Sequence, residues 1–323
     1  MRVLVTGMGG ELGTRVAQLL EERNEVREIL GVDFVPPRRR LRRSEFIRVD
    51  PRDREKLTSV VTDFAPTAVV HFGVYEPSSR VAPRLAAEYT QACTVAALGA
   101  AARTGQLERV ALRSGLVVYG RGRGRPGVPD ETAPVAPTTP YGRSCLEVEA
   151  LAVDLGRRHG FPVAALRMAP EAGSHVPSPL GRVLRLPVVP VPALADPAFQ
   201  LLHQEDSARA MVAALLFGVD GPFNVVGPGA ASVWQAVRLG GRIPWPVFGP
   251  AWKVATRAVE LAGAPMPPHI LELITRGRTA DGSKAVEVLE LGAMRPTQEV
   301  CTELFEWAKV TPLRPALPIA EAQ

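Results

Sequence analysis

Residues 2–33 read RVLVTGMGGELGTRVAQLLEERNEVREILGVD, and this stretch decides the fold expected for the chain. It opens with a short apolar run, Arg2–Thr6, whose β-branched residues are typical of a buried strand. A turn with glycines spaced G-x-x-G-x-x-G follows, then a segment with helical spacing of its apolar residues, then a second apolar run ending at Asp33. Strand, glycine turn, helix, strand and acid, in this order, are the layout of a dinucleotide-binding unit.

Each part of this unit has a physical role. Gly7 lets the chain turn tightly, Gly10 has no Cβ to keep a pyrophosphate away, and Gly13 lets the helix pack close to the strand. The helix N-terminus offers free N–H groups and a partial positive charge to phosphates. Asp33 would accept hydrogen bonds from a ribose diol and repel a 2′-phosphate, which favours NAD over NADP. The alternative is a domain of the same fold that binds a different ligand at this place.

Strand and helix signals alternate from residue 2 to residue 167. After the first two strands, we expect strands at Glu45–Val49, Ala68–Phe72, Val110–Ser114 and Val163–Arg167, and helices at Asp53–Phe64, Leu85–Thr104 and Arg143–His159. Repeated β-α-β units of this kind predict an α/β protein with a parallel sheet covered by helices on both faces, the Rossmann doubly wound fold. Residues 1–167 are therefore expected to form an NAD(P)-binding domain.

The character of the sequence changes after Arg167. Residues 170–199 are rich in proline and show little periodicity, which predicts loops and short strands over the mouth of the site. A helix at Asp206–Phe217 and a strand at Pro222–Val226 follow, and some elements of this region are expected to return to the Rossmann fold. A helix at Ala251–Leu261 would either pack into a core, the more common case, or line an apolar pocket or lid. We expect residues 168–311 to form a smaller, mainly substrate-binding region and residues 312–323 a flexible tail.

The composition excludes several classes of protein. Among 323 residues, 46% are hydrophobic and 22% charged, as in a soluble globular protein, and no uninterrupted apolar run of about twenty residues predicts a membrane span. The chain enters a strand at once, which leaves no room for a signal peptide. Cys93, Cys145 and Cys301 are widely spaced. They predict neither a disulfide framework nor a metal site, and this fits a reducing cytoplasm, where we expect the protein.

One dense basic cluster, RRRLRR at residues 38–43, stands out in a chain of net charge +5. The cluster lies in a loop just after Asp33 and has no interleaved aromatic residues, so we do not expect a nucleic-acid partner. A solvated loop is the simplest interpretation. Contact with a cofactor phosphate, including tolerance of NADP, is the alternative.

Motifs along most of the chain point to one family. They are TGMGGELG at 6–13, VDPRD at 49–53, HFG at 71–73, VYG at 118–120, PYGRS at 140–144 followed by Glu149, QED at 204–206 and DGSK at 281–284. Together they resemble the extended short-chain dehydrogenase/reductases, the NAD-dependent epimerases and dehydratases that act mainly on nucleotide sugars. More narrowly, the sequence is similar to bacterial proteins labelled UDP-glucose 4-epimerases.

The resemblance implies a small-molecule substrate and NAD as the cofactor. The residues that it assigns to the cofactor are Gly7, Gly9, Gly10, Glu11, Leu12, Gly13, Asp33, Asp50, Pro51, Phe72, Gly73 and Tyr141. It also implies a possible homodimer through the helices at Leu85–Thr104 and Arg143–His159. No metal is expected.

The catalytic positions depart from the family. In its members a Tyr exchanges the proton of the substrate alcohol while hydride moves to or from the nicotinamide. A Lys four residues later lowers the pKa of that Tyr, and a Ser or Thr orients the substrate oxygen. Here the Tyr is Tyr141, but the Lys position is Cys145 and the Ser/Thr position is Gly115, with Ser114 as an adjacent substitute. Two Asn positions of the family fall on Thr90 and Pro170.

The missing lysine would have supplied a large stabilisation of the tyrosine phenolate. Lowering a tyrosine pKa from about 10 to about 7 takes roughly 4 kcal/mol of preferential stabilisation of the phenolate. The sequence has no lysine between Lys56 and Lys253, and Arg113 is the better of the remaining candidate cations because Arg143 would point away from Tyr141. Cys145 is more simply a small packing residue than a nucleophile.

Two hypotheses follow. One is an NAD-dependent epimerase, dehydratase or oxidoreductase acting on a nucleotide sugar or related hydroxylated substrate, with Tyr141 as acid/base. The other is a catalytically impaired dinucleotide-binding sensor or scaffold.

Overall fold

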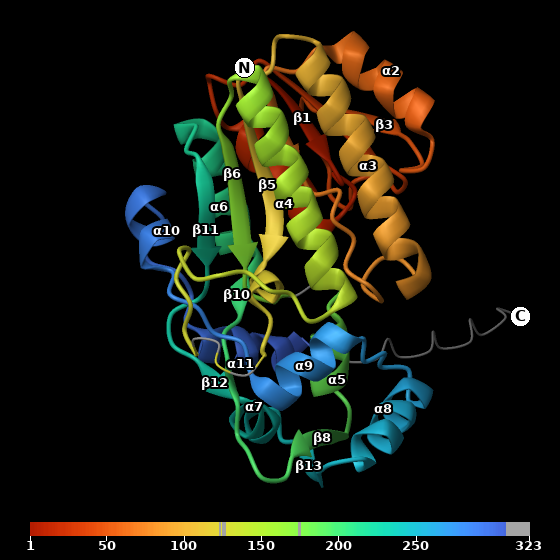
Figure 1. Ribbon diagram of the computed structural model, residues 1–323, viewed down its shortest axis with the longest axis vertical. Coiled ribbons are helices and arrows are strands. Elements are labelled where there is room, and N and C mark those ends of the chain that lie inside the picture. The colour runs from red at the N-terminus through yellow and green to blue at the C-terminus, as the bar shows by residue number, and fades with distance from the viewer. Residues whose placement is uncertain (123, 125–126, 174–175, 308–323) are drawn as a thin grey trace, which may run out of the picture.

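The computed structural model describes residues 1–122, 124, 127–173 and 176–307. Its main body is a seven-stranded sheet in the order β11-β6-β5-β4-β1-β2-β3 (Figure 1). All neighbouring strands in this sheet are parallel. The strands are β1 (Arg2–Thr6), β2 (Glu28–Asp33), β3 (Glu45–Arg48), β4 (Ala68–His71), β5 (Arg109–Gly115), β6 (Val163–Met168) and β11 (Gly221–Val225). This is the doubly wound order, and it confirms the predicted fold class.

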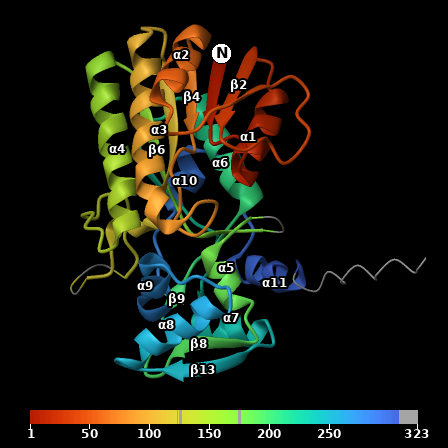
Figure 2. The ribbon, with the colours of Figure 1, turned by 90° about the vertical axis from the view of Figure 1, so that its right-hand side faces the viewer.

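Helices cover both faces of the sheet, as the edge-on view in Figure 2 shows. On one side lie α2 (Arg54–Phe64), α3 (Pro83–Arg103) and α4 (Pro140–His159), and on the other α1 (Glu11–Glu21) and α6 (Gln204–Phe217). The arrows of β5 and β6 point toward a second, smaller lobe (Figure 1). The carboxyl ends of the parallel strands therefore face that lobe, which is where open α/β sheets bind their ligands.

The second lobe is built from short elements after β6. Its strands form three two-stranded pairs: β7 (Glu171–Ala172) with β10 (Leu202–His203), β8 (Val188–Pro192) with β13 (Ile243–Val247), and β9 (Ala198–Phe199) with β12 (Ala231–Ser232). The helices are α5 (Pro179–Leu184), α7 (Val233–Leu239), α8 (Ala251–Leu261), α9 (Pro268–Arg276) and α11 (Thr297–Trp307). α10 (Ser283–Val288) contacts β11 of the main sheet.

Two clusters of buried apolar side chains hold the fold together. The larger lies around the parallel sheet and includes residues from 3–169 and also from 202–226 and 280–291. The smaller lies in the second lobe and joins the Phe199 side chain to α9 and α11 residues. Because the chain crosses between the two clusters more than once, the domain boundary at residue 167 stays a prediction.

Most of the expected elements are present, with instructive shifts at their ends. α4 begins at Pro140 rather than Arg143 because the Thr139 side chain accepts a hydrogen bond from the amide of Gly142 and Pro140 suits the first helical position. Tyr141 is thereby placed in the first helical turn.

The helix at Ala251–Leu261 forms as expected, but the core-packing interpretation was wrong for most of it. Only Ala255 and Val259 are buried, while Leu261 is 90% exposed.

The expected tail at residues 312–323 lies outside the described residues. Among the described residues, we find no helix with both the length and the apolar character needed to cross a membrane.

Candidate functional site

The glycine turn after β1 has the geometry that its sequence predicts. Gly7 has a φ of +72°, in the left-handed region that favours glycine. A Cβ on Gly13 would clash with the carbonyl oxygen of Gly7, so α1 packs directly against the turn. The turn brings the N-terminus of α1 to the carboxyl end of β1.

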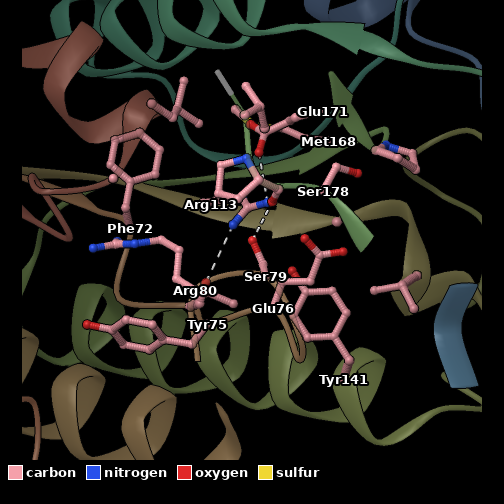
Figure 3. A pocket seen from close by; sticks show the side chains of 18 of the residues that line it. Phe72, Tyr75, Glu76, Ser79, Arg80, Arg113, Tyr141, Met168, Glu171 and Ser178 are labelled. Carbon is pink, nitrogen blue, oxygen red and sulfur yellow. Dashed lines mark hydrogen bonds and ion pairs between the residues drawn. The ribbon is translucent and has the colours of Figure 1, made fainter. Parts of the chain in front are cut away.

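A cavity that is open to solvent extends from this turn to Tyr141. Both lobes contribute to its lining, and Figure 3 shows side chains from each converging on it. From the predicted cofactor and catalytic residues, the lining includes Gly7, Gly10, Glu11, Leu12, Gly13, Phe72, Ser114 and Tyr141. The other predicted residues, Gly9, Asp33, Asp50, Pro51 and Gly73, are not part of this lining. The structure thus brings the glycine turn and the tyrosine to one cavity. Asp33 does not line the cavity but lies against the turn, with its Oδ2 3.0 Å from the point where a Cβ on Gly9 would be.

Asp33 has a partner that sequence reasoning missed. Its Oδ1 accepts from the amide of Phe34 at 2.7 Å, and its Oδ2 accepts from Nη2 of Arg80 at 2.8 Å. The Asp33 side chain is fully buried, and Nη1 of Arg80 lies 2.9 Å from the point where a Cβ on Gly10 would be. Arg80 therefore fills the space between the glycine turn and the acid that was expected to bind a ribose.

The remaining predicted cofactor residues have partners within the protein. Asp50 pairs with Arg52 at 2.9 Å, and this hydrogen bond lowers the pKa of the Asp50 carboxyl. Pro51 is buried beside it. A Cβ on Gly9 would clash with the carbonyl oxygen of Val35, and one on Gly73 would lie 2.6 Å from Sγ of Cys93. These glycines allow close packing, and any contact of this group with a cofactor stays a prediction.

His71 ties the ends of β1 and β4 together beneath the cavity. Its Nδ1 lies 2.9 Å from Oγ1 of Thr6, and its Nε2 lies 3.0 Å from Oγ1 of Thr94. The Thr94 hydroxyl donates to the carbonyl of Thr90, so it accepts from Nε2–H, and the Thr6 hydroxyl donates to Nδ1. A neutral ring satisfies this network, and burial lowers the pKa of His71 to about 3.

Tyr141 and Cys145 lie one turn apart on α4. Burial raises the pKa of Tyr141 well above 10; Cys145 adds to this effect and Arg113 opposes it. Burial likewise raises the pKa of the Cys145 thiol to about 12. A neutral, fully buried thiol neither stabilises a tyrosinate nor acts as a nucleophile, so the packing interpretation of Cys145 fits the structure.

The Ser114 hydroxyl, predicted to orient the substrate, has a partner inside the protein. It donates to Oε1 of Glu149 at 2.5 Å. Glu149 in turn is held by Arg167, whose Nη2 lies 2.8 Å from Oε2. Beside it, Gly115 lines the cavity, and the nearest atom to a Cβ built there is 3.5 Å away, which leaves room for a small side chain.

Charged residues that the sequence did not bring together occupy the Tyr141 end of the cavity. Arg113 on β5 pairs with Glu171 on β7 at 2.7 Å (Figure 3). Burial raises the pKa of Glu171, and Arg113 opposes that shift. Nε of Arg113 and Oε1 of Gln204 are buried without a hydrogen-bond partner among the described residues. They suit a polar ligand, because an unpaired buried polar atom is costly.

A second pair, Glu76 and His269, also lines the cavity. Oε1 of Glu76 lies 3.0 Å from Nε2 of His269, although 193 positions separate the two residues in the chain. The only sequence signal for Glu76 is its position a few residues after the fourth strand. For His269 there is none, since it lies in a proline-rich segment without a motif.

The basic cluster at residues 38–43 folds back on α1. Arg39 pairs with Glu11 at 2.5 Å. Arg43 donates to the carbonyls of Leu20 and Glu21 at the C-terminal end of α1. Two of these arginines thus stabilise α1 and the glycine turn before it, a role that the sequence did not reveal. Among the described residues there is no group of three side chains suited to hold a metal ion, and the expectation of no metal stays a prediction.

Comparison with known proteins assigns the chain to a family. Residues 3–227 match the model of the NAD dependent epimerase/dehydratase family. Uncharacterized proteins of Mycobacterium tuberculosis and Mycobacterium bovis are each 30% identical to the chain over 256 residues, which are 76% of this chain and 68% of the relative.

Solved structures share the fold across almost the whole length. The UDP-glucose 4-epimerase of Thermotoga maritima, solved with UDP-glucose, is 20% identical with a TM-score of 0.72 and covers 96% of this chain and 99% of its own. That of Thermus thermophilus, a complex with NAD, is 24% identical with a TM-score of 0.71 and covers 97% and 100%. The dTDP-glucose 4,6-dehydratase of Bacillus anthracis, also with NAD, is 18% identical with a TM-score of 0.71 and covers 96% of each chain.

Proposed function

The chain belongs to the NAD dependent epimerase/dehydratase family, and we propose that it binds NAD and transfers hydride between NAD and a hydroxylated substrate such as a nucleotide sugar. The observation that carries this proposal is the continuous cavity that runs from the glycine turn to Tyr141. A dinucleotide site and the group that bonds to the substrate oxygen must share one space if hydride is to pass between substrate and nicotinamide.

The residues of the turn fit a dinucleotide. Gly10 and the N-terminus of α1 line the cavity, so free N–H groups are available to a pyrophosphate. Asp33 is covered by Arg80, so a ribose reaches this carboxylate only when Arg80 moves. Structures of the same fold, among them the Thermus thermophilus epimerase, contain NAD, which supports this choice of cofactor.

The Tyr141 end fits a polar, hydroxyl-rich substrate. Arg113, Glu171, Glu76 and His269 offer donors and acceptors of both charges there. Solved structures of the same fold contain UDP-glucose and UDP-glucuronic acid, which supports a nucleotide sugar as the substrate class.

Tyr141 acts in this proposal as a hydrogen-bond donor to the reacting oxygen. Because its pKa lies well above 10, the hydroxyl keeps its proton at neutral pH and can bond to the substrate oxygen. When bound, the nicotinamide supplies or accepts the hydride. The charged groups around Tyr141 orient the substrate.

A dinucleotide-binding sensor or scaffold without turnover is the second candidate. The neutral Cys145 and the engaged Ser114 hydroxyl favour it, because neither supports the proton transfer that hydride transfer requires.

Two measurements test the proposal. The purified protein is titrated with NADH by fluorescence and then, loaded with NAD, is mixed with UDP-glucose, UDP-glucuronic acid or dTDP-glucose while nicotinamide absorbance is followed. Binding together with reduction of NAD supports the enzyme, and binding without reduction by any of the three supports the sensor. Absence of NADH binding at millimolar concentration contradicts both.

A further inference from the structure

Glu76 and His269 come from opposite lobes and meet inside the cavity. Glu76 lies in the segment after β4, and His269 lies in the first turn of α9. Nε2 of His269 is 3.0 Å from Oε1 of Glu76, and the side chains are 3% and 18% exposed, respectively. The contact is therefore shielded from bulk water. An ion pair or charged hydrogen bond is stronger in such a shielded place than on the protein surface.

The His269 ring also lies against Tyr141. The two ring centroids are 4.8 Å apart, at an interplanar angle of 47°. Figure 3 shows Glu76 and Tyr141 on the same side of the cavity, and the Glu76 charge contributes to the raised pKa of Tyr141. The histidine, its carboxylate partner and the tyrosine therefore form one group at the substrate end.

The proposed hydride transfer needs a base that this tyrosine cannot be. A phenol with a pKa above 10 is ionised in fewer than about one molecule in 1,000 at pH 7. No lysine is available along α4, and Cys145 stays neutral. Histidine is the side chain whose ordinary pKa places its charge change near neutral pH.

We propose that His269 is the proton acceptor of the site and that Glu76 is its positioning residue, an inference that rests on the proposed hydride transfer. The substrate O–H bond breaks and its proton moves to Nδ1 of His269. The substrate C–H bond breaks, its electron pair leaves as hydride to the nicotinamide of NAD, and a carbonyl forms. In the reverse direction His269 returns the proton. Tyr141 donates a hydrogen bond to the reacting oxygen throughout.

The arrangement of Glu76 supports this role. A carboxylate that accepts from Nε2–H leaves Nδ1 as the basic nitrogen and stabilises the imidazolium that forms, as in other carboxylate–histidine pairs. Arg278 donates to the His269 carbonyl at 3.2 Å and pairs with Glu272 at 3.0 Å, which fixes the first turn of α9. Two further charged groups at this end, Arg113 and Glu171, are paired with each other.

The activity test compares the wild type with His269→Ala, Glu76→Gln and Thr275→Ala. Each protein is loaded with NAD and mixed with UDP-glucose, and single-turnover reduction of NAD is followed across pH. We expect His269→Ala to lose about 100-fold or more in rate and Glu76→Gln about tenfold, with unchanged NADH affinity. Added imidazole should restore His269→Ala, with a rate that rises with the free-base fraction. Thr275→Ala, on the same helix but bonded only within it, should behave as the wild type.

A second readout needs no substrate. Nitrogen NMR of 15N-histidine-labelled protein, with the His269 signals assigned from His269→Gln, should show Nε2 protonated and Nδ1 bare in the neutral ring. Glu76→Gln should change this tautomer balance. An Nδ1–H tautomer in the wild type overturns the proposal.

The outcomes separate this inference from the proposed function. Turnover that survives in His269→Ala, or a loss that imidazole does not restore, overturns the role of His269 and leaves hydride transfer standing. A wild type that binds NADH but does not reduce NAD overturns both hydride transfer and the role of His269, but not cofactor binding.

Discussion

Nη2 of Arg80 lies 2.8 Å from Oδ2 of Asp33, between the loop after β4 and the end of β2. This ion pair changes how Asp33 would act on the 2′-phosphate of a bound cofactor. Asp33 alone would repel the 2′-phosphate of NADP, whereas an Asp33 whose charge is balanced by an arginine does not. Arg80 also stacks on Phe34, 5.1 Å from its ring centroid, so its guanidinium is held at this place from two sides.

We therefore expect the wild type to bind NADPH within about tenfold of NADH, and Arg80→Met to bind NADPH at least about tenfold more weakly, a difference of about 1.4 kcal/mol. NADH affinity should change less than NADPH affinity. Arg80→Lys keeps the positive charge and should keep the ratio. Fluorescence titration with both cofactors measures it, and a ratio that is the same in wild type and Arg80→Met would show that Arg80 has no part in the choice.

Gly115 and Cys145 stand where the resemblance places a hydroxyl and a lysine. Because a Cβ on Gly115 has no neighbour closer than 3.5 Å, Gly115→Ser should be accepted without loss of stability. We expect Gly115→Ser combined with Cys145→Lys to raise the single-turnover rate by about tenfold or more, since general acid–base groups contribute about 100- to 10,000-fold.

Tyr141→Phe in the same background should abolish the gain. Denaturant unfolding must show that the double variant is folded, because Cys145 is fully buried. An unchanged rate in a folded double variant would mean that a lysine at position 145 does not make Tyr141 a second proton acceptor.

Removal of Arg113 should destabilise the protein through Glu171. Arg113→Met leaves a buried carboxylate without its cation, which typically costs about 3–5 kcal/mol. The cost should be largest at pH 8 and smaller near pH 5, because a Glu171 whose pKa is raised by burial takes up a proton at lower pH. Arg113→Met with Glu171→Gln should recover most of the loss. Urea unfolding at both pH values measures this, and equal losses in the single and double variants would contradict it.

His71 should make the free energy of unfolding decrease in acid. Its pKa falls from 6.5 to about 3 in the folded chain, so the unfolded chain binds a proton between these values that the folded chain does not. The contribution is fully present above pH 6.5 and is lost as pH falls toward 3, by roughly 2 kcal/mol at pH 5.

His71→Gln should be less stable than the wild type at pH 7 and closer to it at pH 5. Urea midpoints at the two pH values give the comparison. Parallel changes in both proteins would show that His71 does not cause the acid sensitivity.

We propose a homodimer through α3 and α4, which pack side by side and keep apolar residues exposed. Val95 on α3 is 44% exposed and Val153 on α4 is 50% exposed. Val95→Glu with Val153→Glu should convert a dimer into a monomer in light scattering after gel filtration. Leu194→Glu, at a residue of the second lobe that is 93% exposed, is the matched control and should leave the mass unchanged. A monomeric wild type would end this proposal.

Local sequence predicted the main sheet because its signals act over short distances. Residues 2–33 encode strand, turn, helix and strand through apolar spacing and glycine position, and the structure reproduces these elements, including the left-handed Gly7. Tyr141 and the missing lysine at position 145 were identified by the resemblance to the family and not by these local signals. Local sequence failed for α8, where apolar residues face solvent, because burial depends on what packs against a helix and not on the helix itself.

The sequence by itself determined the fold class, the glycine turn after β1 and the absence of a lysine four positions after Tyr141. Only the tertiary structure decided which charges meet: Arg80 with Asp33, Arg113 with Glu171, and Glu76 with His269 across 193 positions. The physical reason is the separation along the chain between the residues that interact. Strands and helices form from neighbours in the chain, whereas a buried charge finds its partner only after the sheet and the second lobe have brought distant segments into contact.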